Sequence, residues 1–275
     1  MEKRKKLKDQ IIKFIATVNS HHTGAYAAQA AYFFVLSLIP IFLLLLTMVQ
    51  YTDVTMNDVM NAVLQVFPDS VAPLIRGIVY QVYIQSSGMI PITVIVALWS
   101  AGKGVLSVTS GLNAIYSHTE TRNYFYLRIR ASVYTVLFLL AIMLSLVISV
   151  FGNSISSMVY QHIPFLIKVV DFVMRITFVV LTVFFDLIYK FLPNRKHMAK
   201  TTLRRQLPGA VFTAIGWQLI SFIFSIYLDI FTGFSSMYGS MTTIILILLW
   251  LYGCMYIILL GGELNALLER YFDKK

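Results

Sequence analysis

Long runs of apolar residues, separated by short polar segments, dominate the chain. A helix that crosses a bilayer needs about 20 predominantly apolar residues, and six stretches meet that length. They cover 25–49, 89–116, 129–151, 166–192, 208–231 and 240–268. The pattern therefore predicts an all-α fold, a polytopic transmembrane bundle of six helices in residues 25–268. Residues 1–24 are expected to be a basic N-terminal segment and 269–275 a short tail.

Prolines and local periodicity refine these boundaries. Pro91 and Pro208 stand at predicted helix starts, where the missing N–H costs little, and Pro193 follows the fourth stretch. Pro40 lies inside the first stretch and is expected to kink it. Residues 51–87 repeat apolar positions at near-helical spacing, which predicts short amphipathic helices over the outer mouth or in the membrane interface.

Composition agrees with a membrane protein. Hydrophobic residues make up 58% of the chain and charged residues 12%, with a mean hydropathy of +0.77. Soluble domains average about 45–50% apolar and about 25% charged residues, so a soluble enzyme, a disordered chain and a disulfide scaffold are excluded. The single cysteine, Cys254, cannot form an intrachain disulfide. No Cys/His set has zinc spacing, and we expect no metal or other cofactor.

The basic residues are unevenly distributed, and they set an orientation. If six spans alternate, most of the 22 Lys and Arg residues fall on one side, in both terminal segments and two loops. Basic loops face the cytoplasm, so both termini are predicted to be cytoplasmic. The largest basic group is expected to contact anionic lipid headgroups. It consists of Arg195, Lys196, Lys200, Arg204 and Arg205.

Basic loops also raise the question of a nuclease, which the remaining residues do not support. Phosphodiester hydrolysis usually needs clustered carboxylates that hold metals, or a histidine pair. His118, His162 and His197 fall in different loops, and the acidic residues are scattered. No phosphate-binding glycine loop or serine nucleophile motif is present. We therefore expect neither catalysis nor a nucleic-acid partner.

Polar residues inside the predicted spans are the candidate functional residues. Lys103 lies near the middle of the second span, where a charge is costly and normally faces the bundle interior or water. Ser100, Ser107 and Ser110 recur with Lys103 at helical spacing and form a small, polar stripe. Two interpretations stay open: a tight helix contact with Lys103 paired to a buried carboxylate, or the lining of a transport cavity.

A second polar group belongs to the predicted cytoplasmic half and could bind an anionic headgroup. It contains Gln29, Asp186, Lys190, Glu263 and Asn265. Asp186 is the hypothetical partner of Lys103 across the bundle. Glu263 has an alternative structural role, a bridge to Arg204 or Arg205.

Several ordered motifs carry a resemblance to a known family. They are Ala28–Pro40, Leu98–Gly104, Leu112–Tyr116, Tyr189–Arg195, Leu207–Ala210, Met237–Ser240, Leu249–Tyr252 and Gly261–Ala266. Their order and spacing resemble the YihY/virulence factor BrkB family of bacterial membrane proteins. The resemblance implies a location in the bacterial cytoplasmic membrane. It also implies a role in moving lipids or other envelope components, in place of a former ribonuclease label regarded as misassigned.

The expected function is therefore non-enzymatic transport, resembling a flippase or scramblase, of a lipid or an anionic envelope component. Membrane lipids, especially anionic ones, are the expected partners, and a homo-oligomer is an open alternative. Two other functions remain open: an ion or small-solute channel or transporter, and a structural or assembly factor of the cell envelope.

Overall fold

The computed structural model describes residues 12–49, 56–57, 60–61, 76–77, 79–80, 90–134, 167–194, 203–230 and 240–272. Within these ranges the regular structure is entirely helical. The long helices are α2 (Thr23–Val49), α5 (Ile90–Ile115), α7 (Ile167–Phe191), α8 (Leu203–Ile230) and α10 (Ser240–Phe272). Shorter helical segments cover 12–20 and 124–134. The predicted all-α class is confirmed for this part of the chain.

The hydropathy pattern located most helix ends well. Predicted and observed ends of α2, α5 and α7 differ by two residues or fewer, and α10 continues four residues beyond the predicted end. Within the predicted third span, 129–151, only 129–134 is described, as part of the helix 124–134. Most of the predicted outer segment 51–87 also lies outside the described residues. Helix α2 continues through Pro40.

The helix that contains the predicted fifth span begins five residues before the start predicted for that span. Helix α8 begins at Leu203, so Pro208 lies inside it and not at its first turn. Arg204, Arg205 and Gln206 are polar, and a hydropathy pattern marks the apolar part of a helix but not its polar beginning. Proline at this position removes the N–H that would bond the carbonyl of Arg204.

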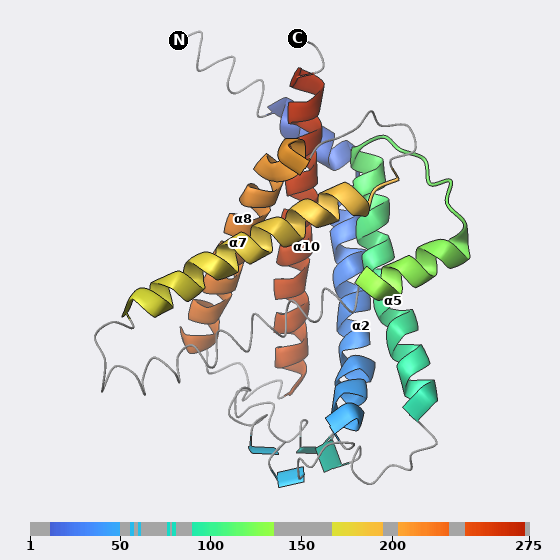
Figure 1. The fold of residues 1–275 in the computed structure, drawn as a ribbon, viewed down its shortest axis with the longest axis vertical. Helices are drawn as coiled ribbons and strands as arrows, with labels where there is room; N and C mark the ends of the chain where they lie inside the picture. The colour runs from blue at the N-terminus through green and yellow to red at the C-terminus, as the bar shows by residue number, and fades with distance from the viewer. Residues whose placement is uncertain are drawn as a thin grey trace.

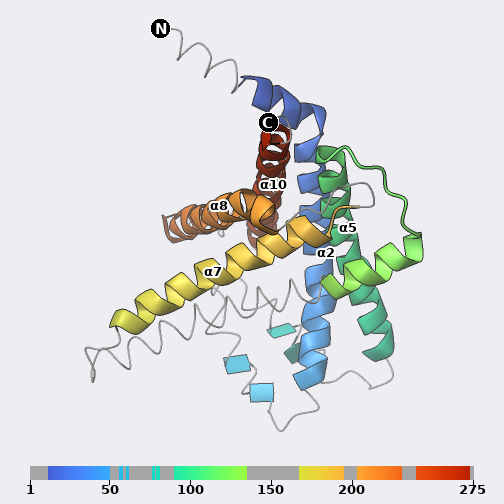
Figure 2. The ribbon, with the colours of Figure 1, turned by 45° about the horizontal axis from the view of Figure 1, so that its top comes forward.

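The long helices pack around α10. Helix α10 contacts α2, α5 and α8, while α2 lies along α5 and α7 contacts α8. Figure 1 shows α7 crossing α8 obliquely, and Figures 1 and 2 both show α2 and α5 side by side. Small residues permit the close contacts. Ala27, Ala30 and Ala31 of α2 are buried, and a side chain at Gly104 of α5 would press on Phe34.

A row of aromatic side chains joins α7, α8 and α10. The ring centroids of Phe185 on α7 and Trp217 on α8 lie 5.6 Å apart, and those of Trp217 and Trp250 on α10 lie 5.8 Å apart. Offset and edge-to-face pairs at such separations are favourable beyond the area that they bury. These aromatic contacts fix the positions of α7, α8 and α10 relative to one another.

Two helical stretches within the described residues are long and apolar enough to cross a membrane, Leu203–Phe224 and Ile244–Glu269. Their outward faces carry large apolar side chains. Phe222 on α8 is 64% exposed and Leu249 on α10 is 60% exposed. An apolar exterior of this kind is typical of a surface covered by lipid.

The polar residues of these helices gather at one end of the bundle. His21 contacts Glu263, Tyr116 contacts Gln206, and Asn194 contacts Asn113. The start of α2, the ends of α5, α7 and α10, and the start of α8 therefore lie together, as Figure 1 shows for α2, α5 and α10. We call this the polar end.

Candidate functional site

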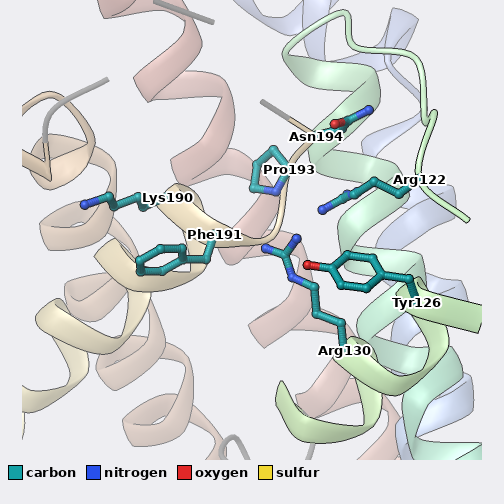
Figure 3. A pocket seen from close by; sticks show the side chains of 7 residues that line it. All are labelled: Arg122, Tyr126, Arg130, Lys190, Phe191, Pro193 and Asn194. Carbon is teal, nitrogen blue, oxygen red and sulfur yellow. The ribbon is translucent and has the colours of Figure 1, made fainter. Parts of the chain in front are cut away.

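An open groove of about 490 Å³ lies at the polar end, between the helical segment 124–134 and the end of α7. Figure 3 shows the side chains that line it. They are Arg122, Tyr126, Arg130, Lys190, Phe191, Pro193 and Asn194. Three of these side chains carry positive charge and none is acidic, so the groove favours an anion.

The three cationic side chains of the groove do not all point in the same direction. In Figure 3 the guanidinium groups of Arg122 and Arg130 point toward one another, while Lys190 extends away past Phe191. Arg130 lies against Tyr134, with its guanidinium carbon 5.3 Å from the ring centroid. The amino group of Lys190 lies 5.3 Å from the ring centroid of Phe191. Cation–π contacts of this kind orient a cation without neutralising it.

Arg122 is held in place by Glu120. Its Nε and Nη2 donate to the two carboxylate oxygens at 2.8 and 2.6 Å, and Nη2 also donates to the carbonyl of Leu192 at 3.1 Å. Burial raises the pKa of Glu120, but the hydrogen bonds and charge of Arg122, with a hydrogen bond from Asn113, outweigh it and lower the pKa to about 2. Glu120 is therefore ionised near neutral pH and cancels the charge of Arg122.

Asn113 and Asn194 fix the walls of the groove. The backbone N–H of Asn194 donates to the side-chain carbonyl of Asn113 at 2.7 Å. The side-chain amide of Asn194 donates to the carbonyl of Thr119 and the hydroxyl of Thr121 at 2.8 and 3.1 Å. These bonds join the loop after α5 to the turn after α7. The sequence indicated only a helix end at Pro193 and did not reveal this link.

A second polar network lies inside the polar end, where α8 crosses α10. The side chain of Asn265 accepts the backbone N–H of Gly209 at 2.7 Å and donates to the carbonyl of Gln206 at 3.0 Å. The hydroxyl of Tyr116 donates to the side-chain carbonyl of Gln206 at 2.9 Å. Asn265 therefore binds the backbone of α8 on both sides of Pro208.

Tyr189 extends this network to α7. Its hydroxyl donates to the carbonyl of Ile258 at 2.6 Å and lies 2.5 Å from the hydroxyl of Thr213. Both hydroxyls occupy the space beside Gly261, where a Cβ would overlap them. These polar groups connect three helices, which is a common use of buried hydroxyls between membrane helices.

Glu263 has a partner that the sequence did not indicate. Its carboxylate, 3% exposed, lies 2.7 Å from Nδ1 of His21 and accepts the hydroxyl of Thr23 at 3.4 Å. Where the sequence suggested Arg204 or Arg205 as an alternative partner of Glu263, the described residues show a bond to His21. The two partners lie 242 positions apart in the sequence, so only the adjacency of the two polar residues His21 and His22 could have drawn attention to this segment.

Comparison with known proteins places the chain in a family. Residues 14–275 match the profile of the family described as virulence factor BrkB. The chain belongs to this family. The resemblance drawn from the ordered motifs is thereby confirmed. Together with its long apolar helices, membership supports a membrane protein.

The relatives that resemble this BrkB-family chain are named as a ribonuclease-like protein and as membrane proteins. The chain is 32% identical over 255 residues to the ribonuclease-like protein YfkH of Bacillus subtilis, with 91% of both chains covered. It is 35% identical over 89 residues to a UPF0761 membrane protein of Idiomarina loihiensis, and over 80 residues to one of Pseudomonas aeruginosa. These matches cover 32% and 29% of this chain, and 30% and 18% of the relatives. No solved structure matches.

The residues of the polar stripe predicted on α5 of this BrkB-family protein do not share one environment in the structure. Lys103 is exposed, and its amino group lies 5.2 Å from the ring centroid of Phe33. Ser107 is buried and donates to the carbonyl of Lys103 at 3.0 Å, whereas Ser110 is exposed. The side chain of Ser100 lies outside the described residues.

The polar group predicted in the cytoplasmic half does not form a single site either. Gln29 is exposed on α2, Asp186 is buried on α7, and Lys190 lines the groove. Within the described ranges, Lys103 and Asp186 do not form the hypothesised ion pair. Arg204 and Arg205 are exposed at the start of α8. The other three members of the expected lipid-contact group, Arg195, Lys196 and Lys200, lie outside the described residues.

Proposed function

We propose that this protein crosses the bacterial cytoplasmic membrane six times, with both termini in the cytoplasm. We further propose that it moves a lipid or another anionic envelope component by non-enzymatic transport. The directions of the long helices support this topology. Relative to the polar end, α2 and α8 run away from it, while α5, α7 and α10 run toward it. A span between α5 and α7 would complete the alternation.

The observation that carries the proposal is the basic groove. The cytoplasmic leaflet attracts basic segments because its anionic lipids give it a negative surface potential. Arg130 presents a planar set of donors that fits phosphate oxygens, and Lys190 adds a second charge nearby. The exposed Arg204 and Arg205, together with Arg195, Lys196 and Lys200, would concentrate anionic headgroups at the same end.

The exposed polar side chains on α2 and α5 are the proposed path for the moving headgroup. These are Gln29, Lys103 and Ser110. Glu263 and Asn265 instead hold helices together through His21 and the backbone of α8. We assign them to the closed inner end of the path, where they would resist separation of the helices.

Lipid movement in reconstituted vesicles tests the proposal. A headgroup-labelled phosphatidylglycerol is quenched from outside, and its rate of exposure is compared with protein-free vesicles. We expect acceleration by the wild type and loss of it in Arg130→Gln and Lys103→Met. Arg76→Gln is the matched control, because it removes an exposed arginine that lies outside the groove. Equal rates with and without wild-type protein would contradict the proposal.

One observation favours a second function, an envelope assembly factor. The interior groups Tyr189, Thr213, Gln206 and Asn265 are engaged in contacts between helices. A scaffold needs such contacts but no polar path. It predicts that a folded Lys103→Met variant complements a deletion strain fully while the wild type accelerates no lipid movement.

A further inference from the structure

The basic groove has two more positive charges than negative ones. Of its three cations, Arg122 is paired with Glu120 through two short hydrogen bonds. Within the described residues, no carboxylate forms an ion pair with Arg130 or Lys190, which rest instead against Tyr134 and Phe191. The flexible four-carbon side chain of Lys190 can turn from Phe191 toward a bound anion, so a ligand that balances the groove brings two negative charges.

The donors of the groove suit phosphate oxygens. Glu120 and the carbonyl of Leu192 engage Nε and Nη2 of Arg122, so Nη1 is left for a ligand. Arg130 uses Nη2 for one long bond of 3.4 Å to the Tyr134 hydroxyl. Figure 3 shows both guanidinium groups turned toward one another, with the Tyr126 hydroxyl pointing toward Arg130. Guanidinium donors in a fixed plane fit the oxygens of phosphate and carboxylate, and the excess of two positive charges favours phosphate between them.

We propose that the groove binds a terminal phosphate, either a phosphomonoester or a diphosphate, in preference to a phosphodiester. A phosphomonoester carries about −1.5 to −2 at pH 7 because its second pKa is about 6. A phosphodiester carries one charge and would leave the groove with an unbalanced cation. The rings of Phe191 and Pro193 offer an apolar wall for the group that bears the phosphate.

The size of the groove agrees with this ligand class. Its volume of about 490 Å³ exceeds what a phosphate alone needs and lies within the range of small-molecule sites. The groove is open, so a phosphate on a lipid headgroup or on a soluble molecule can enter it. The lipid version rests on the proposed function, whereas the phosphate chemistry does not.

Calorimetric titration of the purified full-length protein in neutral detergent tests the preference. The probes are short-chain phosphatidic acid, a monoester, and short-chain phosphatidylglycerol, a diester. We expect the monoester to bind about tenfold more tightly, as one additional charge-assisted contact implies. Arg130→Gln should abolish the difference, and Arg76→Gln should keep it. Equal affinities in the wild type, or an unchanged preference in Arg130→Gln, would overturn the proposal.

A second variant guards against a folding failure. If Arg130→Gln does not fold, Lys190→Gln removes the other unbalanced charge from the end of α7. The monoester preference should then be lost, as in Arg130→Gln, because a diester balances the one excess charge that remains. An unchanged preference in folded Lys190→Gln would contradict the charge balance.

Inorganic pyrophosphate separates the two sources of the phosphate. Displacement of phosphatidic acid by pyrophosphate would show that the groove recognises the phosphate itself, and binding of the lipid alone would assign the site to headgroups. The vesicle assay separates this inference from the proposed function. A monoester preference without lipid movement would refute only the proposed transport. Lipid movement without a preference would refute only the inference.

Discussion

The backbone N–H of Gly209 on α8 donates to the side-chain carbonyl of Asn265 on α10, at 2.7 Å. This bond follows directly after Pro208, where α8 lacks a backbone donor. The amide of Asn265 also donates to the carbonyl of Gln206, so one side chain spans the proline. A helix with an internal proline is tolerated in membranes when neighbouring groups satisfy the freed backbone. The carbonyl that Pro208 frees belongs to Arg204, and Asn265 ties the backbone on either side of the proline to α10 through Gln206 and Gly209.

Replacement of Asn265 should destabilise the protein. Asn265→Leu leaves the carbonyl of Gln206 and the N–H of Gly209 without their side-chain partner, and a buried unsatisfied group costs about 1–3 kcal/mol. We expect a lower midpoint of thermal unfolding for the purified protein in detergent. Gln218→Leu makes the same chemical change at an exposed position of α8 and should alter the midpoint little. Equal midpoints for the two variants would show that Asn265 does not support α8.

Glycine at position 261 is required by the contact between α8 and α10. A Cβ there would overlap the hydroxyls of Thr213 and Tyr189. Gly261→Ala should therefore lower the free energy of unfolding by about 1–3 kcal/mol, the usual cost of overpacking. The control is Gly77→Ala, because Gly77 is helical and a Cβ there would meet nothing within 4 Å.

Gly77→Ala should leave the unfolding midpoint unchanged or raise it, since alanine favours a helix by about 0.5–1 kcal/mol over glycine. Both midpoints are measured by the same thermal scan. A Gly261→Ala protein as stable as Gly77→Ala would show that the contact between α8 and α10 accommodates the added methyl group, which contradicts the prediction.

The apolar pattern predicted the helices because bilayer thickness constrains their length. The ends of α2, α5 and α7 are marked by changes in polarity, which hydropathy detects. The start of α8 was missed because its first turn is polar. Resemblance to the BrkB family could be drawn from ordered motifs along the chain, since these depend on residue identity and not on contacts.

The candidate site could be predicted only in part. Lys190 was expected at an anion site, and it lines the groove. Arg130 was not among the predicted site residues, because its proximity to Lys190 depends on how the helical segment 124–134 meets α7. Lys103 was expected inside the bundle from its depth in the span, but depth does not determine which face of a helix is covered. Long-range partners such as His21 and Glu263 leave no local signal.

The bond between His21 and Glu263 should appear as an energetic coupling. His21→Ala, Glu263→Gln and the double variant form a thermodynamic cycle, and groups in contact usually couple by 0.5–3 kcal/mol. We expect each single variant to lower stability and the double variant to lose less than their sum. The bond joins the segment before α2 to α10, so the loss should also expose residues 12–20 to proteolysis.

A neighbouring histidine provides the control for this cycle. His22 is exposed and has a φ of 53°, which asparagine tolerates better than most residues. His22→Asn combined with Glu263→Gln should give additive effects. Additivity for His21→Ala as well would show that the 2.7 Å contact contributes no stability.

Glu120 should make the stability of the groove depend on pH. Its pKa falls from an ordinary 4.5 to about 2, because the bonds and charge of Arg122 and the bond from Asn113 outweigh the opposing effect of burial. A carboxyl whose pKa is lower in the folded state stabilises the protein fully above its unfolded pKa. That stabilisation is lost as the pH falls from about 4.5 toward 2.

Glu120→Gln cannot ionise and should lack this contribution at every pH. We expect wild type to unfold at a higher temperature than Glu120→Gln at pH 7, and the difference to shrink steadily below pH 4.5. Thermal scans in a maltoside detergent avoid titration of the detergent itself. A difference that stays constant from pH 7 to pH 3 would contradict the ion pair. It would also remove the reason for counting Arg122 as neutralised, and with it the two-charge excess that selects a terminal phosphate.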